Sequence, residues 1–135
     1  EKAHLIQYHE LWGNAPLIRM NYLNSLITQA KYFNKTVIYG NPHAILKGTY
    51  TKWLVHSFLS LLQNGKDEYA PSFAFPQIEF ISILEEILGK KIETIYANWW
   101  YDYDYSFPGI EENLKMASTE ETKEALKEIL HGSNH

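Results

Sequence analysis

The 135-residue sequence contains no cysteine, which excludes disulfides, thiolate metal sites and thiol nucleophiles. Arginine occurs once, at Arg19, which disfavours sites that depend on bidentate capture of phosphate or carboxylate by a guanidinium group. No apolar run reaches the roughly 18 residues that a membrane span needs. Residues 1–13 have neither the basic region nor the continuous apolar stretch of a secretion signal. We therefore expect a soluble, cytoplasmic protein with no membrane partner.

The sequence also lacks the motifs that would identify a reaction type. It has neither G-x-G-x-x-G nor G-x-x-x-x-G-K-[ST], the loops that cradle phosphates, and no G-x-S-x-G nucleophile motif. The six histidines include no H-E-x-x-H pair, and His4 and His9 lie five positions apart, about 140° around a helix. The sequence therefore predicts no catalytic residue, no metal site and no cofactor.

Charge is unevenly distributed along the chain. The net charge is −4, but residues 1–91 are slightly basic, whereas residues 92–135 carry nine acidic side chains and three lysines. Affinity for a phosphate backbone comes largely from Lys and Arg, so this acidic third argues against nucleic acid as a partner. A basic protein is the partner that the charge distribution favours.

The hydrophobic pattern predicts a mainly α fold: a compact bundle of about five to six helices around one core, with or without a short strand pair. We expect residues 1–135 to form a single globular domain, with residues 1–14 and 131–135 as peripheral or flexible ends. Turn residues and caps place helices at 16–33, 49–64, 76–88, 108–117 and 118–131. Residues 35–40 fit a short strand, and residues 92–99 fit either type, with helix favoured.

The predicted helix at 49–64 is apolar around most of its circumference. Trp53, Phe58 and several leucines leave it little polar surface before Asn64-Gly65 ends it. A helix that is hydrophobic on nearly all sides is normally buried. We therefore expect this helix at the centre of the fold.

The segment WWYDYDY, residues 99–105, combines five aromatic rings with two carboxylates in seven positions. Tyr and Trp provide large, rigid contact areas with one polar atom each, and neighbouring carboxylates steer towards a cationic surface. The alternative is that the two tryptophans are core residues and the aspartates cap a turn. Asp102-x-Asp104 also matches the D-x-D motif of glycosyltransferases, but the chain shows no regular alternation of strands and helices to accompany it.

This acidic aromatic surface is similar to those by which small bacterial immunity proteins and nuclease inhibitors occupy the basic active-site cleft of a toxin. The resemblance implies a non-enzymatic inhibitor that binds a basic protein, such as a nuclease toxin. The mechanism would be steric occlusion with charge complementarity. The predicted partner-binding residues are Trp99, Trp100, Tyr101, Asp102, Tyr103, Asp104, Tyr105, Glu111 and Glu112.

Two other functions remain open from the sequence. One is a small enzyme whose composite pocket draws acid and base groups from His43, His56, Asp102 and Asp104. The other is a regulatory helical module that binds a peptide or a glycan through its aromatic surface. A cleft that brings a histidine within hydrogen-bond reach of an aspartate would favour the first, and exposed flat rings would favour glycan binding.

Overall fold

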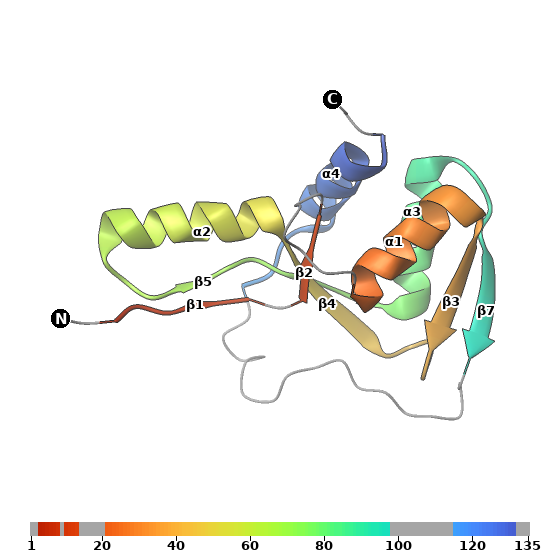
Figure 1. Cartoon of the computed structure of the whole chain (residues 1–135), viewed down its shortest axis with the longest axis horizontal. Helices are drawn as coiled ribbons and strands as arrows, with labels where there is room; N and C mark the ends of the chain where they lie inside the picture. The colour runs from red at the N-terminus through yellow and green to blue at the C-terminus, as the bar shows by residue number, and fades with distance from the viewer. Residues whose placement is uncertain (1–2, 9, 14–20, 98–114, 132–135) are drawn as a thin grey trace.

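The computed structural model in Figure 1 describes residues 3–8, 10–13, 21–97 and 115–131. Within these ranges, four helices combine with seven short strands. In chain order the elements are β1 (Ile6–Gln7), β2 (Glu10–Trp12), α1 (Tyr22–Phe33), β3 (Lys35–Tyr39), β4 (Ile45–Tyr50), α2 (Thr51–Asn64), β5 (Glu68–Tyr69), β6 (Phe73–Pro76), α3 (Gln77–Leu88), β7 (Glu93–Ala97) and α4 (Thr119–Leu130).

The strands pair between segments that are distant in sequence. The central sheet has the order β2-β4-β6, with β2 parallel and β6 antiparallel to β4. β3 pairs in parallel with β7, and β1 pairs in parallel with β5. Figure 1 shows β3 and β7 beside α1 and α3 at one end of the molecule, and α2 above β1 and β5 at the other end.

The prediction of a mainly α bundle of five to six helices is wrong, because the described chain is mixed α/β. β4 and β6 lie where the sequence predicted turns and a helix start, and β7 lies where helix was favoured. These strands have only four to six residues, and their hydrogen-bonding partners are far away in sequence. Hydrophobic periodicity indicates which face of an element is buried. It does not indicate which distant segment will pair with that element.

The helices themselves follow the local signals. Ser118 and Glu121 form the reciprocal capping box at the start of α4, and Gly65 and Gly89 adopt left-handed conformations just after α2 and α3. Asn21 caps α1 by accepting a hydrogen bond from the Asn24 amide. The predicted start at Pro16 and most of the predicted helix 108–117 lie outside the described residues.

The core forms where α1, α3 and α4 meet the central sheet. Trp12, Phe73 and Phe80 are fully buried. The ring of Phe73 lies 5.7 Å from that of Trp12 and 5.1 Å from that of Phe80, measured between centroids. Full burial of an apolar side chain contributes about 1.5–3 kcal/mol, so these three rings contribute substantially to the stability of the fold.

Gly48 in β4 allows this core to close. A Cβ atom at this position would overlap the Cδ2 atom of Leu23, and would also lie 3.0 Å from Trp12 Cδ1 and 3.1 Å from Phe73 Cε2. β4 lies between β2 and β6 in the central sheet, so it has little freedom to move away. The glycine is therefore required by the close approach of three side chains.

The expectation that the helix at 49–64 lies at the centre of the fold is wrong. Of the residues of α2, only Ser57 is buried. Phe58 and Leu62 are 48% and 62% exposed. The helix packs on β1, β4 and β5 through one side and leaves the other side open (Figure 1). In the described residues, no helix combines the length and apolar character that crossing a bilayer requires.

Candidate functional site: an acidic cleft between α2 and α4

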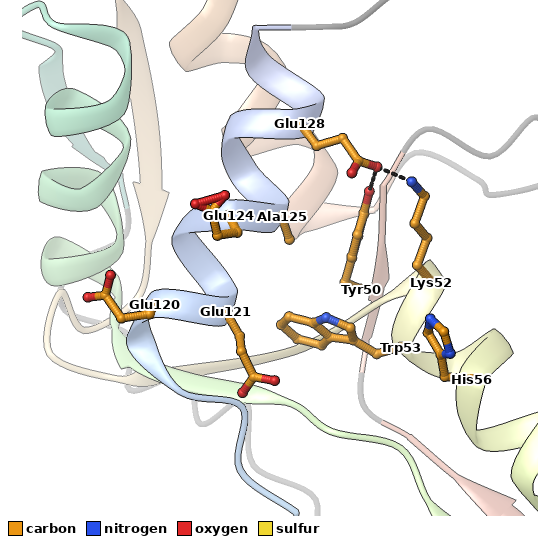
Figure 2. A pocket seen from close by; sticks show the side chains of 9 residues that line it. All are labelled: Tyr50, Lys52, Trp53, His56, Glu120, Glu121, Glu124, Ala125 and Glu128. Carbon is orange, nitrogen blue, oxygen red and sulfur yellow. Dashed lines mark hydrogen bonds and ion pairs between the residues drawn. The ribbon is translucent and has the colours of Figure 1, made fainter.

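A cleft of about 430 Å³ lies between the first turns of α2 and one side of α4 (Figure 2). Its walls combine two aromatic rings with several charged side chains. It is lined by Tyr50, Lys52, Trp53, His56, Glu120, Glu121, Glu124, Ala125 and Glu128. Four carboxylates and one ammonium group line the cleft, so the cleft is acidic.

One wall is positioned by the direct junction of β4 and α2. Tyr50 is the last residue of β4 and precedes the first residue of α2 without a break. Residues three apart on a helix share a face, so Trp53 and His56 follow Tyr50 on the side towards α4. The indole of Trp53 projects into the gap between the two helices (Figure 2).

Trp53 is held in place by aromatic contacts with the core. Its ring meets that of the fully buried Trp12 edge-on at 5.8 Å and that of Tyr50 edge-on at 5.8 Å. Such edge-to-face pairs contribute about 0.5–1.5 kcal/mol beyond the area that they bury. The half-buried indole therefore presents a fixed apolar surface to the cleft.

The other wall comes from the spacing of the acids on α4. Glu120, Glu124 and Glu128 are four residues apart and line one side of the helix, while Ala125 and Leu126 are buried. The helix is held by its buried apolar side in the core, and Lys123 also pairs with Glu86 of α3 at 3.0 Å. Like charges at this spacing repel, and the charge of Glu128 is balanced by Lys52 of α2 and the hydroxyl of Tyr50 at the end of β4.

Tyr50, Lys52 and Glu128 form a connected group at one end of the cleft. The Tyr50 hydroxyl donates to Glu128 Oε1 at 2.6 Å, and the Lys52 ammonium pairs with the same oxygen (Figure 2). The hydrogen bonds from Lys52 and Tyr50 lower the pKa of Glu128. Burial, with the nearby Glu128 carboxylate, raises the pKa of Tyr50 well above its usual value. Tyr50 thus remains a donor at neutral pH, and Glu128 remains ionised.

A second cavity of about 250 Å³ continues the cleft towards β5. The two share Trp53, His56 and Glu121, and the second adds the small hydroxyls of Ser57 and Ser60. Its other lining residues are Glu68, Pro71 and Lys115. The site is therefore an elongated groove whose centre is an indole ring beside an imidazole and a carboxylate.

The partner-binding residues predicted from the sequence cannot be placed in this site. Residues 99–105, 111 and 112 lie outside the described residues, and so do Asp102 and Asp104 of the composite pocket. His56 lines the cleft, while His43 lines a different cavity beside Pro76 and Glu79. Binding of a basic protein through 99–105 stays a prediction. The α-helical immunity-type class is wrong, because the fold is mixed α/β.

The sequence pattern missed Tyr50, Lys52, Trp53, Glu124 and Glu128 as site residues. One signal was available: the acids of α4 repeat at four-residue spacing, which costs helix stability unless something faces them. What faces them comes from α2, almost 70 residues earlier, and only the fold brings the two together. In the part of the chain that the structure describes, no three His, Asp or Glu side chains cluster closely enough to hold a metal ion.

No protein-family model and no curated protein matches this sequence. The structure is similar to solved enzymes that act on nucleotide sugars. The UDP-glucuronic acid 4-epimerase of Bacillus cereus, in complex with UDP-glucuronic acid and NAD, matches with a TM-score of 0.65 and 18% identity. The match covers 95% of this chain and 45% of that enzyme.

Two further solved enzymes show the same likeness. The UDP-N-acetylglucosamine 4-epimerase of Methanobrevibacter ruminantium M1 matches with a TM-score of 0.67 and 14% identity, over 93% of this chain and 44% of that one. The dTDP-glucose 4,6-dehydratase of Streptomyces venezuelae matches with a TM-score of 0.60 and 15% identity, over 95% and 42%. This chain spans less than half the length of these enzymes, and at such identities the likeness establishes a mixed α/β fold similar to part of theirs.

Proposed function

We propose that this chain is the sugar-binding portion of a sugar-modifying enzyme and that it holds the hydroxyl-bearing ring of its ligand in the cleft between α2 and α4. The single observation that carries the proposal is the composition of that cleft, in which a fixed indole stands among carboxylates. The likeness to part of several epimerases and a dehydratase is consistent with it.

The cleft offers the two kinds of contact that a pyranose ring uses. The flat face of Trp53 can cover the C–H face of a sugar, which is apolar. Glu121 and Glu124 are exposed on the wall formed by α4 and can accept hydrogen bonds from hydroxyl groups. Hydrogen bonds to an ionised acceptor are stronger than those between neutral groups, so two such acceptors beside one ring are sufficient to orient it.

Charge restricts the ligand further. Four carboxylates surround the cleft, and its one lysine, Lys52, is already paired with Glu128. A diphosphate placed among them would be repelled, because like charges at short range in a partly desolvated site cost several kcal/mol, of the order given by about 332/(εr). The site therefore suits a neutral or amino sugar, and any nucleotide diphosphate attached to the sugar must extend away from α4.

A dinucleotide would be bound elsewhere in the enzyme. The sequence has no G-x-G-x-x-G loop, the turn by which doubly wound folds bring backbone amides to a pyrophosphate. A redox cofactor would accordingly be bound by another segment or polypeptide. This chain would contribute sugar recognition, with Tyr50 and Glu128 as a fixed donor and acceptor pair at one end of the groove.

The test is a nuclear magnetic resonance titration of the ¹⁵N-labelled chain with methyl glucoside, glucosamine and UDP-glucose. We expect the first two sugars to shift the Trp53 indole N–H signal and the amides of α4, and UDP-glucose to bind no more tightly than methyl glucoside. Glu124→Gln should weaken binding of glucosamine several-fold. Glu79→Gln is the matched control, because it makes the same change on α3, away from the cleft.

Two results would contradict the proposal. One is the absence of any shift at the cleft with all three compounds. The other is binding of UDP-glucose alone, with shifts elsewhere in the molecule, because that would place recognition on the nucleotide and away from α4.

A cationic protein segment is a second candidate occupant of the same cleft. The observation that favours it is the exposed row of acids Glu120, Glu121 and Glu124 beside an aromatic ring. A lysine-rich peptide added to the labelled chain would then shift the α4 amides, and the affinity would fall steeply with salt. Shifts with the peptide and none with the sugars would replace the first proposal by this one.

A further inference from the structure

The second cavity lies along the face of α2 that carries Trp53, His56, Ser57 and Ser60. Spacings of three, four and seven residues place these side chains in one row on the helix. The row spans seven residues, or about 10.5 Å along the helix axis. Trp53 begins the row and also lines the first cleft, so its indole lies where the two cavities meet. The groove thus continues past this ring for about two turns of the helix.

The hydroxyl of Ser57 is the most informative group in this cavity. Ser57 is only 5% exposed, and among the described residues its hydroxyl has no hydrogen-bond partner, although the residue lines the cavity. Buried polar groups are hydrogen-bonded in nearly all native structures, because leaving one unsatisfied costs free energy. The hydroxyl is therefore available to a molecule that occupies the cavity.

Two further polar groups of the cavity are fixed in place. The Ser60 hydroxyl donates to Glu68 Oε2 at 3.1 Å and accepts from Asn64 Nδ2 at 3.1 Å. These bonds tie Glu68 of β5 to α2, so its other carboxylate oxygen keeps a defined position from which it can accept. A sugar hydroxyl both donates and accepts, and Ser57 beside Glu68 offers both kinds of partner.

Charge distinguishes the second cavity from the first. It is lined by two carboxylates, Glu68 and Glu121, and by the ammonium group of Lys115. The first cleft has four carboxylates, and its lysine is paired with Glu128. The second cavity is less acidic, but its carboxylates still outnumber its lysine, which disfavours a phosphate or a carboxylate as ligand. An uncharged molecule rich in hydroxyl groups is the best match.

We propose that the second cavity is a subsite for a second sugar ring, so that the ligand of this chain is a disaccharide or a longer glycan. The inference rests on the proposed function, which places the first ring against Trp53 beside α4. The glycosidic bond passes the indole where the two cavities meet. The second ring then forms hydrogen bonds with Ser57 and Glu68, which a single ring in the first cleft leaves unused.

The test is a titration of the ¹⁵N-labelled chain with methyl glucoside, cellobiose and maltose. The two disaccharides join the same rings in opposite anomeric configurations, so they cover both directions of the second ring. We expect at least one of them to bind about tenfold more tightly than methyl glucoside, because one or two added hydrogen bonds supply roughly that factor. It should also shift the amide signals of Ser60 and Glu68, which methyl glucoside should not.

Ser57→Ala removes the unpartnered hydroxyl. We expect this variant to lose most of the preference for the disaccharide over methyl glucoside. Its thermal unfolding should match that of the wild type, because the described fold loses no hydrogen bond. Ser82→Ala is the matched control: it makes the same change on α3, at a residue that lines a different cavity, and it should leave the preference intact.

The inference is overturned if both disaccharides bind no more tightly than methyl glucoside, or if Ser57→Ala keeps the preference. A shift of the Trp53 signal by methyl glucoside would, in either case, leave the proposed function standing with a site for one ring. The absence of any shift at the cleft with all three sugars would remove the proposed function as well. A clear loss of thermal stability in Ser57→Ala would show that the hydroxyl is bonded within the fold, and would also count against a second subsite.

Discussion

The two ends of the molecule use the same kinds of residue in opposite ways. Around α1, α3 and the central sheet, rings such as Phe73 and Phe80 are fully buried and stack on one another. On α2, Phe58 and Leu62 face solvent, and Trp53 is only half-covered. Apolar side chains at the first end stabilise the fold, whereas the exposed ones on the outer side of α2 contribute little to it. The difference leaves α2 with apolar surface that the fold itself does not bury.

The largest expected effect comes from truncating a matched pair of phenylalanines. Phe80→Ala should lower the free energy of unfolding by about 3–5 kcal/mol, because it leaves a cavity in the core. Phe58→Ala should change it by less than about 0.5 kcal/mol in dilute solution, since the side chain is half-exposed. Urea denaturation of both variants measures the difference. A similar loss of unfolding free energy in the two variants would mean that Phe58 is part of the core, and that α2 does not differ from the rest of the fold in this way.

Gly48→Ala tests how tightly the core is closed. The new methyl group would press against Leu23, Trp12 and Phe73, and overpacking of this kind costs about 1–3 kcal/mol. Gly65→Ala, at the end of α2, is the comparison, because nothing lies within 4 Å of a Cβ atom there and only its left-handed backbone is strained. Thermal unfolding should show the larger loss for Gly48→Ala. The opposite order would mean that β4 can move away from its neighbours.

The smallest expected effect concerns Glu10, whose carboxylate accepts a hydrogen bond from the Leu23 amide at the start of α1. Burial raises the pKa of Glu10 above its ordinary value, partly opposed by that hydrogen bond. The folded state therefore binds the proton more tightly than the unfolded state does. The stability that this contributes is present below the unfolded pKa of 4.5 and is lost as pH rises through the folded pKa.

Glu10→Gln keeps an oxygen that can accept from Leu23 and removes the buried charge. We expect a gain below about 1 kcal/mol at neutral pH. The gain shrinks as the pH falls through the raised folded pKa of Glu10 and is gone below the unfolded value of 4.5, where wild-type Glu10 is protonated as well. Denaturation at several pH values measures the trend. A variant less stable than the wild type at neutral pH would show that the negative charge at the helix N-terminus outweighs its burial.

The sequence was informative wherever the signal is local. Helix ends at Ser118, Gly65 and Gly89 depend on neighbours within four residues, and the structure confirms them. Local signals do not predict the strands. β4 and β7 are strands because they hydrogen-bond to segments that are distant in the sequence. The apolar circumference of the helix at 49–64 predicts a central position, but composition does not show what covers a helix, and α2 lies on the surface.

The candidate site failed to appear in the sequence for the same reason. Its two walls belong to the beginning of α2 and to α4, and no motif joins Tyr50 to Glu128. The acidic character of the C-terminal third was read correctly from composition, and the described acids of α4 do line a cleft. The aromatic ring beside them is Trp53, from another part of the chain.

The pairing of β3 with β7 limits when this part of the fold can form. Lys35 lies opposite Glu93, 58 positions later, so the pair cannot form until both strands have left the ribosome. Until then β3 is an unpaired edge that can recruit other chains. Contacts between such distant segments also slow folding, typically to milliseconds or seconds. Shortened versions that end before residue 97 should therefore aggregate, whereas the full chain refolds.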